Sequence, residues 1–179
     1  CSKFINYLSE IQSELINKYK NNKYSPAYPT LNVGKINGGL AVNIIPNKCV
    51  MEFEIRDTPE MESKLFINKI KRFLKELEVD MKKKVKNCKI ELEVKNNFPP
   101  LLTDNSSDFI SLCLQALKKN STSAVSFGTE AGIFNEIGFE TIVCGPGSIK
   151  QAHKPNEFIE IKQLDKCRDF ILKLIELQY

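Results

Sequence analysis

Apolar residues recur at helical spacing near the start of the chain and again before its middle. In residues 3–20 they are separated by three or four positions, which predicts an amphipathic helix with one buried stripe. The stripe consists of Phe4, Leu8, Ile11, Leu15 and Tyr19. A second helix is expected over residues 60–84. Its inner stripe consists of Phe66, Ile70, Phe73, Leu77 and Met81.

Strand patterns follow each of these helices. The runs "TLNVGKIN" and "LAVNII" flank Gly38 and Gly39, a two-residue signal that predicts a β-hairpin. Residues 48–56, "KCVMEFEIR", alternate cleanly between apolar and polar, which predicts a half-buried antiparallel strand. Its inward positions are Cys49, Met51, Phe53 and Ile55. A further strand is expected at "KIELEVK", with Ile90, Leu92 and Val94 inward. This order of elements is that of a ferredoxin-like unit lacking its first strand.

The pattern changes after Pro99 and Pro100, and we place a domain boundary near residue 100. The segment "DNSSD" can cap the helix that follows. Its buried face consists of Phe109, Cys113, Leu114 and Leu117. Next come a strand "SAVSF", a short helix at about 131–137, a strand "ETIVC" and a last helix at about 163–177. The expected fold is α/β: an α+β domain over residues 1–100, then a partial α/β domain over residues 101–179 with a mixed sheet covered by helices.

Composition indicates a soluble globular chain. Of its 179 residues 42% are hydrophobic and 27% are charged, and no apolar run approaches the roughly 18 residues needed to span a bilayer. Nothing at the start resembles a signal peptide, so we expect a cytoplasmic protein without a membrane partner. The chain opens at Cys1, without an initiator Met, and we expect it to be part of something longer.

Charge and cysteine content argue against a nucleic-acid-binding protein and against one held together by disulfides or structural zinc. The net charge is only +4, and the basic run "KKKVK" lacks interleaved aromatic residues, so we expect no nucleic-acid partner. The six cysteines contain no CxxC pair, and several occupy apolar positions of the expected elements. We interpret them as small buried hydrophobic residues in a reducing compartment, not as disulfides or zinc ligands.

Four polar features stand where the pattern leads us to expect apolar residues or simple turns. The only histidine, His153, follows the strand "ETIVC" and the turn "GPG", and it can be a metal ligand, a base or a surface residue. In "SFGTEAG" a strand leads into a helix start, where exposed amides favour an anion, although Thr129 can equally serve as the helix cap. Asn43 lies inside an expected strand, where Asn is disfavoured. Arg56 ends a strand and can bind a carboxylate or form a surface ion pair with Asp57.

A resemblance emerges when three segments are taken together: "TLNVGKINGGLAVNIIPNKCVMEFEIRD", "SFGTEAGIFNEIGF" and "TIVCGPGSIKQAHKPNEFIEI". They resemble the metal-dependent amidohydrolases and peptidases of the M20 group, and within it the acetylornithine deacetylases. In that family a catalytic domain with a two-metal site, zinc or cobalt, carries an inserted ferredoxin-like lid that also forms the dimer interface. The chain resembles most of the lid plus the last part of the catalytic domain.

The resemblance also implies roles for the polar features. His153 matches the last metal ligand of the family, and Arg56 and Asn43 match lid residues that bind the substrate carboxylate. Gly128, Thr129 and Glu130 match the loop that lines the substrate pocket. The family's other metal ligands and its Glu general base belong to the part before the lid. We therefore expect weak or no metal binding, no catalytic residue, and no activity in this chain alone.

The function implied is hydrolysis of N-acetyl-L-ornithine to ornithine and acetate, a step of arginine biosynthesis. A succinyl-diaminopimelate desuccinylase, or another hydrolase acting on N-acyl amino acids, is an alternative within the group. A non-catalytic dimerisation or binding module is an alternative outside it. The expected partners are a small N-acyl amino acid and either a second copy bound through the lid or a separate amino-terminal chain.

Overall fold

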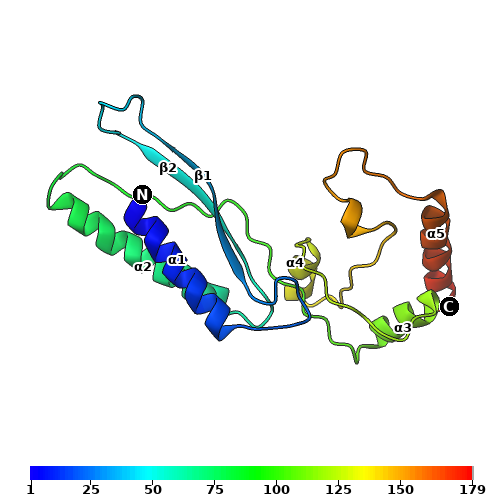
Figure 1. Ribbon diagram of the computed structural model, residues 1–179. Helices are drawn as coiled ribbons and strands as arrows, with labels where there is room; N and C mark the ends of the chain where they lie inside the picture. Colours follow the sequence, from blue (N-terminus) through cyan, green and yellow to red (C-terminus); the bar gives the residue numbers. More distant parts are fainter. Residues whose placement is uncertain (179) are drawn as a thin grey trace. The chain divides into compact units, whose positions relative to one another are not determined.

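A computed structural model describes residues 1–178 of the chain. The chain divides into two compact units, Cys1–Pro100 and Leu101–Tyr179. The first unit contains helix α1 (Ser2–Lys18), strand β1 (Thr30–Gly38), strand β2 (Cys49–Arg56) and helix α2 (Ser63–Lys82) (Figure 1). Helix α2 lies within the predicted range of 60–84, and α1 begins one residue before the predicted range of 3–20 and ends inside it.

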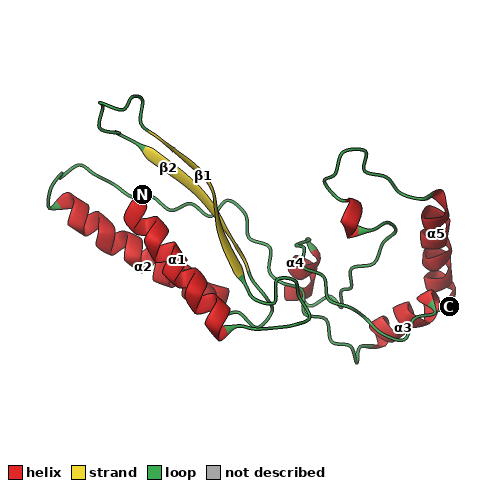
Figure 2. Cartoon of the chain, in the orientation of Figure 1, coloured by secondary structure: helices red, strands yellow, loops and turns green. Residues whose placement is uncertain are grey.

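Strands β1 and β2 form an antiparallel two-stranded sheet, shown as arrows in Figure 2. Leu31 pairs with Ile55 and Val33 with Phe53, and the register shifts between Val33 and Lys35. The predicted alternation of β2 is confirmed from Met51 onward, because Met51, Phe53 and Ile55 are half-buried and the residues between them are exposed; Cys49, predicted to be inward, is exposed. One face of the sheet is therefore apolar and can pack against helices.

The core of the first unit lies between this face and the two helices. One cluster comprises Ile11, Leu15, Tyr19, Met61 and Phe66. The other comprises Phe4, Leu8, Ile70 and Leu74. The predicted stripe of α1 is confirmed, whereas the stripe of α2 runs through Leu74, and Met81 at its end is exposed.

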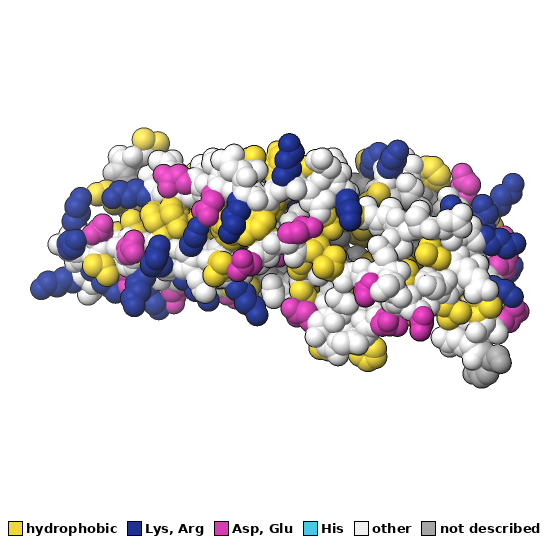
Figure 3. Space-filling model, turned by 90° about the horizontal axis from the view of Figure 1, so that it is seen from below, with side chains coloured by type: hydrophobic (Ala, Val, Ile, Leu, Met, Phe, Trp, Pro, Cys, Tyr) yellow, Lys and Arg dark blue, Asp and Glu magenta, His cyan; other side chains and the backbone are white. Residues whose placement is uncertain are grey.

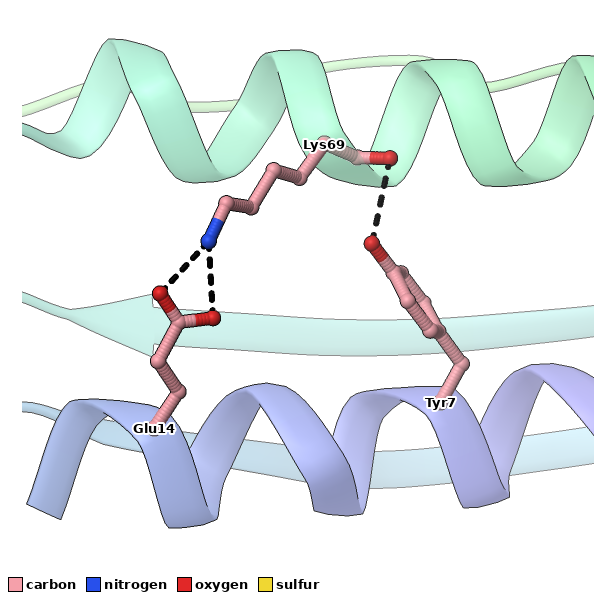
Figure 4. A network of polar contacts seen from close by, with 3 residues as sticks. All are labelled: Tyr7, Glu14 and Lys69. Atoms are coloured by element: carbon pink, nitrogen blue, oxygen red, sulfur yellow. Dashed lines mark hydrogen bonds and ion pairs between the residues drawn. The ribbon is translucent and has the colours of Figure 1, made fainter. Parts of the chain in front are cut away.

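Polar contacts join the two helices across their outer surface (Figure 4). The Lys69 ammonium donates to both oxygens of Glu14, at 2.5 and 2.7 Å. The Tyr7 hydroxyl donates to the backbone carbonyl of Lys69 at 3.4 Å, and its ring stacks on that of Phe73 at 3.9 Å. Because Glu14 and Lys69 are each about 40% exposed, their ion pair stabilises the helix pair weakly, by less than about 1 kcal/mol.

Two strands predicted in the first unit are not formed. Residues 40–45 form an exposed turn instead of the second hairpin strand, and Leu40, Val42 and Ile45 are more than 90% exposed. The alternating segment at β2 pairs with β1 in their place, which leaves residues 39–48 as the connecting loop. Residues 89–95 form no ladder with β2, although Ile90 and Leu92 pack against the core and Lys95 reaches Glu52 at 3.3 Å. The predicted ferredoxin-like sheet is thus reduced to two strands.

The regular secondary structure of the second unit is helical in the residues that the structure describes, and long loops connect the helices. It contains α3 (Asp108–Leu117), α4 (Ala131–Glu136), a 3₁₀ turn η1 (Ile149–Gln151) and α5 (Ile161–Glu176). Ser107 caps α3 by accepting the N–H of Ile110. The helices confirm the prediction, but the predicted strands at 123–127 and 140–144 are absent, and with them the mixed sheet. A strand requires a neighbouring backbone to bond to, and these two segments do not pair with each other.

Burial in the second unit is slight. Ile110 and Cys113 are its buried apolar side chains, and α5 buries none of its described residues. Ile161 is 77% exposed and Ile137 is 66% exposed. No helix among residues 1–178 is both long enough and apolar enough to cross a membrane.

The packing predicts a large effect of truncating Phe66. Its side chain is 1% exposed and belongs to the same buried cluster as Ile11 and Leu15 of α1. Phe66→Ala should lower the free energy of unfolding by about 3–5 kcal/mol, because it removes buried surface and leaves a cavity. Leu65→Ala, at the neighbouring and exposed position, should change it by less than about 0.5 kcal/mol. Urea unfolding followed by circular dichroism measures both values, and equal losses in the two variants would contradict the described core.

Candidate functional site

The single histidine lies on the surface of the second unit. His153 follows η1 and is exposed, and its backbone is left-handed, with φ of 61°. That conformation costs a non-glycine residue roughly 1–2 kcal/mol. The backbone N–H of His153 donates to a carboxylate oxygen of Glu157 at 3.1 Å, which holds the turn. The sequence analysis did not identify Glu157 as a partner of His153. The feature that could have pointed to it is its position, an acidic residue four positions after the histidine.

The segment "SFGTEAG" leads into α4. The Thr129 hydroxyl accepts the N–H of Ala131 at 3.1 Å. The N-cap of α4 is nevertheless Glu130, which makes no capping bond through its side chain, so Thr129 lies one residue before the position that the capping interpretation gives it. Gly128 is exposed, and a Cβ added there would meet nothing within 4 Å. Glu130 is exposed as well. Thr129 between them is half-buried.

Arg56 ends β2 on the face opposite the core. Its Nε donates to a carboxylate oxygen of Glu54 at 3.0 Å, and the two side chains are 65% and 51% exposed. An exposed pair of this kind contributes about 0–1 kcal/mol and leaves the other guanidinium nitrogens for a ligand. Asp57, the expected partner of Arg56, instead accepts a hydrogen bond from the Ser63 hydroxyl at the start of α2. Burial raises the pKa of the Asp57 carboxyl.

Asn43 lies in the loop 39–48, not inside a strand as predicted. The N–H of Ile44 donates to the carbonyl of Ala41 at 3.1 Å, which closes a tight turn around Asn43. Its apolar neighbours Val42 and Ile45 are exposed. Asn43 and Arg56 thus belong to the first unit, whereas residues 128–130 and His153 belong to the second.

The donor set of the described residues does not fit a complete metal centre. Among residues 1–178 no three His, Cys, Asp or Glu side chains gather where they could hold an ion. A two-metal hydrolase site needs about three protein ligands for each ion. His153 could supply one ligand, so further ligands would have to come from outside these residues.

The cysteines differ from their predicted state. Cys113 is buried as expected, and burial raises the pKa of its thiol. Cys1, Cys49 and Cys144 are exposed, and Cys88 and Cys167 are half-buried. Cys144 is exposed because residues 140–144 do not form the buried strand that the apolar run predicts.

Comparison with known proteins gives a consistent result. Residues 5–82 match the family described as the peptidase dimerisation domain of the M20 group. The acetylornithine deacetylase of Buchnera aphidicola subsp. Acyrthosiphon pisum (strain Tuc7) is 35% identical over 159 residues, which are 88% of this chain and 40% of that protein.

Two other relatives extend the match. The acetylornithine deacetylase of Pasteurella multocida (strain Pm70) is 31% identical over 94% of this chain, and that of Buchnera aphidicola subsp. Schizaphis graminum (strain Sg) is 33% identical over 96%. The chain spans 40 to 44% of the length of these curated relatives. Residues 5–82 therefore match a peptidase dimerisation domain of the M20 group, and most of the chain is similar to part of the acetylornithine deacetylases.

Proposed function

We propose that the chain is the carboxyl-terminal part of a metal-dependent amidohydrolase that cleaves N-acetyl-L-ornithine into ornithine and acetate. The observation that carries the proposal is the extent of the match. Similarity to proteins named acetylornithine deacetylase covers 88 to 96% of the chain, well beyond the dimerisation domain at residues 5–82. Such an activity belongs to arginine biosynthesis in the cytoplasm.

The two units take separate roles in this proposal. Residues 1–100 are the lid and dimerisation domain, and residues 101–179 are the end of the catalytic domain. The thin core of the second unit supports its assignment, because exposed apolar side chains such as Phe134, Ile161 and Ile171 need to be covered to be stable in water. Hydrophobic side chains reach the surface on the face drawn in Figure 3. The rest of a catalytic domain would cover them.

The polar residues take the roles of binding groups. The Arg56 guanidinium binds the carboxylate of the amino acid through charge-assisted hydrogen bonds, and Asn43 binds the same end of the substrate. Gly128, Thr129 and Glu130 line the pocket, and His153 is one ligand of zinc or cobalt. The remaining ligands and the general base come from the part of the enzyme that precedes the lid. The chain alone is therefore inactive and binds metal weakly.

The dimerisation domain supports a second copy of the chain as partner, bound through the first unit. The exposed apolar loop residues Leu40, Val42 and Ile45 are suited to such a contact, since burying them removes apolar surface from water. A separate amino-terminal chain is the other expected partner. It would cover the second unit and not this loop.

Two alternatives remain open. Desuccinylases and other hydrolases of N-acyl amino acids share the reaction chemistry, and only substrate comparison separates them. A non-catalytic dimerisation module is favoured by one observation, the lack of a three-ligand cluster among the described residues.

The proposed function can be tested in a chimera. The aligned part of the Buchnera aphidicola (strain Tuc7) acetylornithine deacetylase is replaced by this chain. We expect zinc- or cobalt-dependent hydrolysis of N-acetylornithine in the chimera, faster than of N-succinyl-diaminopimelate, and none from the chain alone. His153→Ala in the chimera should lower kcat/KM by at least about 100-fold, whereas Lys154→Ala should leave it nearly unchanged. A folded chimera that hydrolyses neither substrate would favour the non-catalytic module.

Arg56 provides a test of the lid. In the active chimera, Arg56→Lys should lower kcat/KM by roughly 10-fold or more and leave the Tm nearly unchanged, because Lys keeps the charge but loses the bidentate geometry. Glu54→Gln is the matched control: it removes the ion-pair partner and spares the guanidinium. Kinetics of the two variants separate the roles, and an unchanged Arg56→Lys variant would reduce Arg56 to a surface ion pair.

The dimer contact can be tested on the chain itself. Val42→Asp places a charge in the exposed apolar loop and should weaken self-association by at least 10-fold, because that charge would be buried at the interface. Val85→Asp, at an exposed apolar position after α2, is the control. Sedimentation equilibrium gives the two dissociation constants. Equal constants would exclude the loop from the interface.

A further inference from the structure

Two exposed cysteines of the first unit are held in place by its secondary structure. Cys1 is the N-cap of α1, and its carbonyl accepts the N–H groups of Phe4 and Ile5 at 2.9 and 3.0 Å. Cys49 is the first residue of β2 and pairs with Gly38 across the sheet. These backbone hydrogen bonds and the strand pairing fix the starting point of each side chain.

The packing of α1 on the sheet brings the two sulfur atoms together. Cys49 lies on the same face of β2 as Phe53, and the Phe4 ring meets the Phe53 ring at 5.6 Å. The Sγ atoms of Cys1 and Cys49 are 2.9 Å apart, although 48 positions separate the residues in sequence. A disulfide requires about 2.05 Å, so a movement of less than about 1 Å would join them.

Gly38 makes room for this arrangement. A Cβ at position 38 would lie 2.9 Å from the Cys49 Sγ, closer than such contacts occur, and 3.1 Å from its Cβ, which is a tight contact. The absence of a side chain at Gly38 therefore leaves the space in which the Cys49 sulfur lies. The other glycine of β1, Gly34, has only ordinary neighbours, with Asn32 at 3.9 Å.

We propose that Cys1 and Cys49 form a reversible oxidation site, at which a peroxide converts the two thiols into a disulfide. With hydrogen peroxide, a thiolate of the pair attacks a peroxide oxygen and the O–O bond breaks. The cysteine becomes a sulfenic acid, and the expelled hydroxide takes up the proton that the thiol released and leaves as water. The second sulfur then attacks the sulfenic sulfur, the S–O bond breaks, and a second water leaves as the S–S bond forms. Two thiols are oxidised by two electrons and one peroxide is reduced to two waters. A dithiol reverses the reaction by exchange.

The disulfide would fasten the start of α1 to the start of β2. It closes a loop that contains all of α1, all of β1 and the exposed loop 39–48. Closing a loop of this length removes freedom from the unfolded chain, so the oxidised first unit should melt at a higher temperature. The inference does not depend on the proposed hydrolase activity.

The test uses the full chain and hydrogen peroxide. We expect the count of free thiols to fall by two, the chain to lose the mass of two hydrogen atoms, and a peptide linking Cys1 to Cys49 to appear on a non-reducing digest. The oxidised chain should melt roughly 5 °C or more above the reduced one, and dithiothreitol should restore the original value. Cys49→Ser should abolish all of these changes, and Cys88→Ser, at a half-buried position, should leave them intact.

Two further glycine variants test the geometry without removing a thiol. Gly38→Ala should slow the cross-link several-fold, because its methyl group displaces the Cys49 sulfur, whereas Gly34→Ala in the same strand should not. Linkage of Cys1 or Cys49 only between chains, or a cross-link that persists in Cys49→Ser, would overturn the proposal. Equal rates in the two glycine variants would refute the geometric basis.

Discussion

The first unit depends on the burial of two helical stripes against one face of a two-stranded sheet. A hairpin alone is at best marginally stable in water, and so is a single helix of 17 residues. Each becomes stable here because Leu15 and Phe66 fill the space between the helices while Phe53 and Ile55 close it from the strand side. The remaining features of the unit, including the position of Arg56 on the outer face and the approach of Cys1 to Cys49, follow from this packing.

Helices were far more predictable than strands in this chain. The stripe from Phe4 to Leu15 is local information, because a helix satisfies its own backbone hydrogen bonds. Strand β2 could also be found, since strict alternation identifies a half-buried strand. Residues 40–45 and 140–144 are apolar without alternation, and such runs show only that a segment can be buried. Whether they become strands depends on finding a neighbouring strand to pair with, and the periodicity of the sequence carries no information about that partner.

The sequence predicted the local position of each candidate site residue, but it did not predict which residues contact one another. Sequence patterns placed Arg56 at a strand end, Thr129 before a helix and His153 after a turn, and each residue has that position in the structure, although the N-cap of α4 is Glu130 and not Thr129. The partners of these residues could not be derived. Glu54, not Asp57, meets Arg56, because alternate residues of a strand share a face whereas adjacent ones do not. Glu157 reaches the backbone of His153 through a turn that only the folded chain reveals.

The slight burial in the second unit affects its thermodynamics. The heat-capacity increment of unfolding and the denaturant dependence of stability both scale with the surface newly exposed. A unit that already exposes Ile137, Ile161 and Ile171 has little left to expose. We therefore expect its unfolding to change only gradually with temperature and with urea concentration. The cooperative heat absorption of the chain should then come mainly from residues 1–100.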